Sequence, residues 1–214
     1  MQLQPGTVRL PLLFGFVCLM LVACTQGEKG NRNEQNSSSP VGDLSEDEKA
    51  RYLEKGLDIS SQSQQTLMQN VMAARKRGGV PEALKYCNVR AYELVDSLSA
   101  ANGAHIKRAS HRARNPADAP TMLEKEIISQ YLTVLQSNGA PRPRIELTAG
   151  GDSVAFFRPI VLNNPACLAC HGEPGREIKP EHVQLIRELY PKGNAMGHKK
   201  GDLRGVWSIT FKRQ

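Results

Sequence analysis

The most constraining feature of the sequence is a Cys-x-x-Cys-His pentapeptide formed by Cys167, Cys170 and His171. Two thiols at this spacing can add to the two vinyl groups of a haem, and the histidine can then offer its imidazole to the iron from the same side. This interpretation predicts one covalently attached c-type haem. Such a large apolar group would also help to fill the core of a chain with only 5% aromatic residues.

Three other uses of the cysteine pair compete with this interpretation. A zinc site needs more ligands, and the sequence has no second cysteine pair. A disulfide across two intervening residues is strained. A thioredoxin-like dithiol pair is the strongest rival, but its motif opens a long helix in a βαβ unit. Here Gly172, Pro174 and Gly175 interrupt the chain just after the motif.

Residues 1–23 have the features of a bacterial export signal. Arg9 precedes an apolar run from Leu10 to Ala23, which is too short to span a bilayer as a permanent helix. The run ends in a Leu-Val-Ala-Cys sequence that resembles a lipobox and implies lipidation of Cys24; an ordinary signal peptide cut nearby is the alternative. Thr25 in place of an aspartate favours the outer membrane. We therefore expect a lipid-anchored protein on the periplasmic face of a bacterial membrane, where c-type haem is attached.

The remaining chain is expected to form a polar, flexible tether over residues 24–43 and one domain over residues 44–214. Apolar spacing and end signals predict helices over 45–77, 81–102, 121–137 and 181–189, with a candidate break in the polar stretch 60–65. Strands are predicted over 144–148, 154–162 and 204–211, and an ordered loop over 105–120. Because helices come first and strands later, the expected class is α+β.

The net charge of +7 favours acidic partners or anionic surfaces. The basic residues are scattered, and no aromatic-studded basic element accompanies them, so we expect no nucleic-acid partner.

The cysteine count leaves one residue without a role. Of the five cysteines, Cys18 falls in the export signal, Cys24 is expected to take lipid, and the pentapeptide uses two. Cys87 remains, on the apolar face of the second predicted helix, where a lone cysteine is ordinarily a small core residue.

Taken in order, segments between about residues 80 and 212 resemble the family of single c-type haem domains with a PAS-like fold. Members occur as stand-alone periplasmic cytochromes and as extracytoplasmic sensor domains of histidine kinases. The segments that carry the resemblance are Cys87, 106–110, 114–116, 157–160, 167–172, 190–191 and 201–205. The resemblance implies an antiparallel sheet with helices on one face, and two short strands beyond the three predicted above.

The resemblance also implies that Cys87 is the second axial ligand, opposite His171. A thiolate stabilises ferric iron and lowers the reduction potential relative to a methionine ligand. The chain offers other candidates for this position, of which Met196 and His198 rank next: His105, His111, His182, His198, Met68, Met72, Met122 and Met196. Gly197-His198 departs from the family pattern, in which an aromatic residue commonly follows this glycine.

Arginines can bind haem propionates, because the guanidinium group pairs with carboxylates in a bidentate manner. The candidates for this role are Arg108, Arg114 and Arg158, whereas Asp202 and Arg204 are expected to fix a turn.

The function predicted from these features is one-electron transfer by a small, lipid-anchored cytochrome with an unidentified redox partner protein. The main alternative is a haem that senses redox state or a diatomic gas and acts through a separate partner. A catalytic haem needs an open iron site, which six-coordinate iron provides only if Cys87 or another ligand leaves easily. We therefore expect an electron carrier or a haem sensor rather than an enzyme, and no catalytic residue is predicted.

Overall fold

The structure is a computed structural model in which residues 42–214 are described. The predicted export signal, the predicted lipidation site Cys24 and all but the last two residues of the predicted tether lie outside this range. Within the described range, no helix combines the length and the apolar character needed to cross a membrane.

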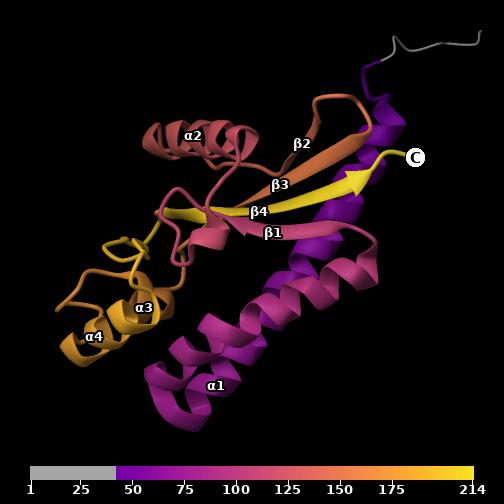
Figure 1. Ribbon diagram of the computed structural model, residues 1–214. Helices are drawn as coiled ribbons and strands as arrows, with labels where there is room; N and C mark the ends of the chain where they lie inside the picture. The colour runs from indigo at the N-terminus through magenta and orange to yellow at the C-terminus, as the bar shows by residue number, and fades with distance from the viewer. Residues whose placement is uncertain (1–41) are drawn as a thin grey trace, which may run out of the picture. The chain divides into compact units, whose positions relative to one another are not determined.

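Four antiparallel strands form one sheet in the order β1-β4-β3-β2 (Figure 1). The strands are β1 His105–Ala109, β2 Arg144–Leu147, β3 Ser153–Val161 and β4 Leu203–Lys212. The longest pairing joins β3 to β4 and is irregular between Ile160 and Val161. The three predicted strands and the α+β class are therefore confirmed. The family resemblance implied two further strands, and the described residues contain one of them, β1.

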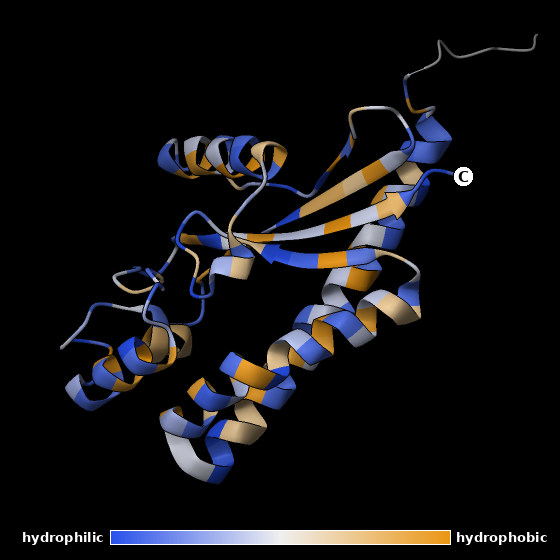
Figure 2. Cartoon of the chain, viewed as in Figure 1, coloured by the Kyte–Doolittle hydropathy of each residue, from blue (hydrophilic) through white to orange (hydrophobic). Residues whose placement is uncertain are grey.

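The segment 105–109 was predicted as part of a loop, and this prediction is wrong, because the segment forms the edge strand β1. Only Ile106 and Ala109 of this strand are buried, so its sequence lacks the apolar alternation of a fully covered strand. Its partner β4 specifies the strand by pairing Ile106 with Ile209 and Ala109 with Val206. In Figure 2, β1 is accordingly largely hydrophilic, whereas β3 carries a hydrophobic stretch.

The long helix α1, Glu46–Asn102, has two arms that meet at a glycine pair. Its first turn is capped by Ser45 and Glu48, each accepting a hydrogen bond from the other's backbone N–H. Gly78 and Gly79 have non-helical backbone angles, and Gly79 has a φ of 70°, which glycine adopts without strain. The predicted stop at these glycines is confirmed. We call residues 46–77 the first arm and residues 80–102 the second arm.

The polar stretch 60–65 does not break the first arm. Ser60 and Ser63 are fully buried, on the same side of the helix as Gly56. A Cβ atom on Gly56 would lie 2.2 Å from the Phe156 ring. Small residues on this side therefore let the first arm approach the sheet closely, which explains why serines occupy a core position.

Helices cover both faces of the sheet, so the expectation of helices on one face is wrong. One hydrophobic cluster joins α1 to Phe156, Trp207 and Ile209. A second joins α2, Met122–Gln136, to the opposite face through Phe157 and Val206 (Figure 1). Successive strand residues point to opposite faces, so β3 buries four residues in a row from Val154 to Phe157.

The remaining elements are short and lie beyond the end of the sheet. They are two 3₁₀ turns, Pro116–Asp118 and Pro165–Cys167, and the helices α3, Leu168–His171, and α4, Pro180–Leu189. A third cluster packs Val80 and Leu84 of the second arm against Ile178 and Ile186. The thioredoxin-like alternative is wrong, because the sheet is antiparallel and the cysteine pair opens a helix of four residues.

Candidate functional site

One cavity gathers most of the residues that the sequence singled out. It is lined by α1 on both sides of the glycine pair, by the end of β1, by the turn that carries the Cys-x-x-Cys-His motif, and by the start of β4. The predicted residues on its wall are Cys87, Arg108, Arg114, Cys167, Cys170 and His171. Cys87 comes from the second arm of α1, so the fold brings it to the motif across 80 positions of sequence (167 − 87).

The motif is held in a tight turn. The Asn164 side chain accepts a hydrogen bond from the Ala166 backbone N–H at 2.9 Å and starts the 3₁₀ turn that precedes α3. Gly172 ends the helix, and its N–H donates to the Leu168 carbonyl at 2.8 Å. A Cβ atom on Gly172 would lie 2.7 Å from that carbonyl oxygen, so glycine is required here. The turn thus places both cysteines and His171 on the cavity wall.

His171 is half-buried on the cavity wall and is fixed through its Nδ1 atom. This atom lies 3.1 Å from the Ala195 carbonyl oxygen and 3.0 Å from Nη2 of Arg114. Burial holds the pKa of His171 well below its ordinary value, and the charges of Arg204 and Arg114 lower it further. The imidazole is therefore neutral at neutral pH, which is the form that binds a metal ion.

The cavity wall carries an excess of positive charge. Four arginines and one aspartate line it: Arg75, Arg108, Arg114, Arg204 and Asp118. Burial lowers the pKa of Arg204 to about 10, and the neighbouring Arg114 and Arg108 act in the same direction. Nη1 of Arg114 is buried without a hydrogen-bond partner among the described residues. Buried cations without partners are costly, so this wall suits an anionic group.

The thiols at the wall are free and lie in low-dielectric surroundings. No disulfide joins Cys167 to Cys170, so the disulfide alternative is not realised in the structure. Burial raises the pKa of the Cys87 thiol, whereas Arg108, Arg114 and Arg204 oppose this by favouring the thiolate.

The donors fit a large prosthetic group better than a bare metal ion. Within residues 42–214, no three His, Cys, Asp or Glu side chains come close enough together to hold an ion, although three cysteines and a histidine line this one cavity. The zinc alternative therefore lacks a site in the described part of the chain. A larger group that fills the space between these donors is compatible with their positions.

Arg158, a predicted carboxylate partner, is not part of the cavity wall, and its assignment needs correction. Its guanidinium donates to Ser61 Oγ at 2.7 Å and to Ser60 Oγ at 3.3 Å, so it ties β3 to the first arm of α1. Arg204 was expected to fix a turn, but it lines the cavity and donates to Ser110 Oγ at 2.8 Å. Only its neighbour Asp202 serves the turn, by accepting from the Lys199 N–H.

The other candidate axial ligands divide into two groups. Met68 and Met72, from the first arm, line the cavity. His198 and Met196, which ranked next after Cys87, do not line it. The buried His198 lies behind His171, where its backbone N–H donates to the His171 carbonyl oxygen at 2.9 Å. The remaining candidates are also absent from the cavity wall: His105, His111, His182 and Met122.

The sequence did not indicate that several other residues line the cavity. They include Arg75, Asp118, Tyr190 and Arg204. Tyr190 stacks under Arg114, with the guanidinium carbon 5.5 Å from the ring centroid, and donates to the Leu84 carbonyl at 3.2 Å. The only sequence signal for Tyr190 was its place in the family resemblance. No local pattern separates Arg204, which lines the cavity, from a solvated arginine.

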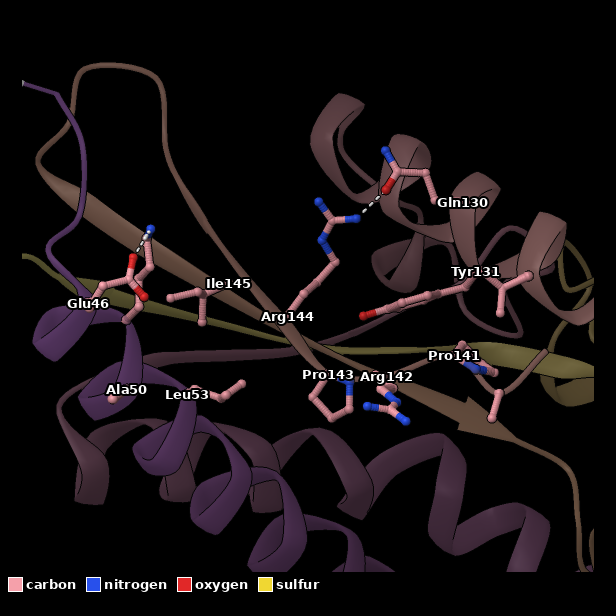
Figure 3. A pocket seen from close by; sticks show the side chains of 13 residues that line it. Glu46, Ala50, Leu53, Gln130, Tyr131, Pro141, Arg142, Pro143, Arg144 and Ile145 are labelled. Atoms are coloured by element: carbon pink, nitrogen blue, oxygen red, sulfur yellow. Dashed lines mark hydrogen bonds and ion pairs between the residues drawn. The ribbon is translucent and has the colours of Figure 1, made fainter. Parts of the chain in front are cut away.

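A second hollow lies elsewhere and lacks this chemistry. It is a groove between the start of α1, α2 and the proline-containing segment 140–145 (Figure 3). Arg144 reaches across it to donate to Gln130 of α2. Its lining contains neither cysteine nor histidine, so it offers no site for the predicted group.

The comparisons with known proteins agree with the resemblance expected from the motifs. The family described as Tll0287-like matches residues 46–212. The crystal structure of the cyanobacterial haem-protein Tll0287 is similar, with 25% sequence identity and a TM-score of 0.55, and the match covers 74% of this chain and 95% of that one. No curated protein matches the chain. Because the family match spans well over half of its length, the chain belongs to the Tll0287-like family.

Proposed function

We propose that the cavity binds one haem covalently through Cys167 and Cys170, with His171 and Cys87 as the axial ligands of its iron. The observation that carries this proposal is the gathering of these four donors around one cavity whose wall has an excess of arginines. A crystal structure similar to this chain is that of a protein described as a haem-protein, which supports haem binding at this cavity.

Each group of wall residues has a distinct task in this proposal. The two motif thiols form the covalent links, and the neutral imidazole of His171 offers Nε2 to the iron while Nδ1–H donates to the Ala195 carbonyl. Arg108, Arg114 and Arg204 neutralise the carboxylates of the haem. Bound in this way, the haem supplies a one-electron redox couple.

If His171 and Cys87 both bound the iron, no coordination position would be left open for a substrate, and the site would suit electron transfer rather than catalysis. We further propose that lipid at Cys24 anchors the protein on the periplasmic face of a membrane, with the outer membrane favoured, where it exchanges electrons with a partner protein. Fractionation of the producing cells tests the anchor. Recovery of the mature protein in the soluble fraction would contradict it.

The test of covalent binding is production of the full chain in a host that attaches c-type haem. We expect haem to remain with the wild-type protein in a denaturing gel and to give sharp low-spin bands after reduction with dithionite. The double variant Cys167→Ala/Cys170→Ala should lose all covalent haem, and Cys87→Ala, the matched control, should keep it. A wild-type chain that folds in this host without haem would overturn the proposal.

The axial role of Cys87 is tested in the haem-loaded Cys87→Ala variant. Loss of a thiolate ligand should change the ferric absorption spectrum and raise the reduction potential, because thiolate stabilises ferric iron. Met68→Leu is the control, since Met68 also lines the cavity. If Met68→Leu changes the spectrum and Cys87→Ala does not, the methionine is the ligand. Carbon monoxide binding to the reduced wild type would favour the gas-sensing alternative over a pure electron carrier.

A further inference from the structure

Arg114 lies where it can act on the proposed iron ligand as well as on a bound anion. It is only 7% exposed and sits between the Cys-x-x-Cys-His turn and the loop 194–198. Its Nη2 atom donates to the carbonyl oxygens of Cys170 and Ala195, the latter at 2.9 Å. The same atom is 3.0 Å from Nδ1 of His171.

The number of hydrogen bonds that Arg114, His171 and the two carbonyls can form together favours one tautomer of His171. The Nη2 amino group of Arg114 carries two protons but faces three candidate acceptors, which are the carbonyl oxygens of Cys170 and Ala195 and the Nδ1 atom of His171. With a bare lone pair on Nδ1, the two Nη2 protons would be shared among three acceptors. With a proton on Nδ1, this proton goes to the second lone pair of the Ala195 oxygen at 3.1 Å, and each of the two carbonyls keeps an Nη2 proton, so the arrangement gains one hydrogen bond. The arrangement thus favours the proton on Nδ1 and leaves Nε2 as the free nitrogen.

We propose that Arg114 is a positioning residue for His171: by binding the Cys170 and Ala195 carbonyls with one amino group, it fixes the imidazole in the tautomer and orientation that present Nε2 to iron. This inference rests on the proposed function. It differs from a role as carboxylate partner, because that role would use Nη1, which is buried without a partner among residues 42–214.

A neighbouring arginine provides a matched control. Arg112 holds the same loop from the other side, by donating to the carbonyls of Met196 and Gly197, but it is not hydrogen-bonded to His171. Replacing Arg112 by methionine removes a charge and a loop contact of the same kind. Arg112→Met therefore tests the effect of losing support for the loop alone, whereas Arg114→Met also removes the contact with His171.

The experiment compares haem-loaded wild type with Arg114→Met, Arg114→Lys and Arg112→Met. The readouts are the low-spin ferric signal in electron paramagnetic resonance and the reduction potential. For Arg114→Met we expect retained covalent haem, a low-spin signal split into more than one species, and a lower potential, because a cation beside the ligand is lost. Arg114→Lys should restore the potential but leave the split signal, because an ammonium is a point charge without the planar fork that reaches both carbonyls.

Three results would overturn the inference. They are an unchanged signal in Arg114→Met, full rescue of the signal by Arg114→Lys, and an equal change in Arg112→Met. If Arg114→Met does not fold, the signal of Arg114→Lys decides alone. Failure of the proposed function is distinguishable, because it would appear as absence of haem in the wild type before any variant is compared.

Discussion

The two ends of the sheet use arginine in opposite ways. Where α1 begins, Arg213 bonds to Glu48 with an N–O distance of 3.0 Å, and Arg144 pairs with Glu146. At the cavity, the buried Arg114 and the half-buried Arg204 form no ion pair with a carboxylate of the described chain. The first end is neutralised within the protein. At the cavity end, the excess of arginines suits the anionic groups of the haem that we propose binds there.

The two ends also differ in packing, because the first end is tightly packed and the other end contains the cavity. At the first end, the arm of α1 lies so close to β3 that Gly56 faces the Phe156 ring without room for a methyl group. At the other end, both arms of α1 and the motif turn leave a cavity. Variants at the close-packed end should therefore act on stability whether or not haem is bound. Variants of the cavity wall should depend on the haem.

Among the variants at the two ends, Gly56→Ala is expected to change the free energy of unfolding most. On an exposed helix position, this change stabilises by about 0.5–1 kcal/mol, because alanine is the better helix former. Here the new methyl group would clash with Phe156, and overpacking costs about 1–3 kcal/mol. We expect lower urea midpoints for both the loaded and the haem-free protein. Ala73→Gly, at an exposed position of the same arm, controls for helix propensity. A Gly56→Ala protein more stable than wild type would show that the contact is not tight.

Arg108→Met is expected to change the free energy of unfolding less. The direction of this change should differ between the haem-free and the haem-loaded protein. The charge of Arg108 adds to the lowering of the pKa of Arg204, so its removal relieves repulsion. In the haem-free protein, the free energy of unfolding should stay within about 0.5 kcal/mol of wild type or rise. In the loaded protein it should fall, because a partner of the haem carboxylates is lost.

Arg213→Met is the matched arginine variant at the other end. It should lower the urea midpoint slightly with and without haem, because it leaves Glu48 without its partner. If Arg108→Met and Arg213→Met changed the urea midpoint equally, both with and without haem, the proposed difference between the two ends would be contradicted.

Features set by neighbours in the chain could be predicted from the sequence. The capped start at Ser45, the stop at Gly78 and Gly79, and the strand pair that flanks 150–152 all depend on local backbone preferences. The Cys-x-x-Cys-His motif is equally local. Its cysteines and histidine are neighbours on the cavity wall because they share one turn.

Features set by distant contacts could not be predicted in this way. The buried serines Ser60 and Ser63 looked like a weak point of a helix, because nothing local shows that a sheet packs against them. The edge strand β1 is specified by β4, and the burial of Arg204 follows from the cavity. The periodicity placed Cys87 on an apolar helix face. Its expected role as a ligand came from the family resemblance alone.

The position of Cys87 has a consequence for how the chain holds together. Cys87 and His171 are 84 positions apart in the sequence (171 − 87) and belong to different elements. Iron bound by both would link the second arm of α1 to the motif turn, much as a disulfide links two segments. In the simplest model, closing a loop of this length removes unfolded-chain entropy worth about 4–5 kcal/mol. The proposed redox centre would then also be a cross-link, and release of either ligand would loosen the end of the molecule that the sheet does not reach.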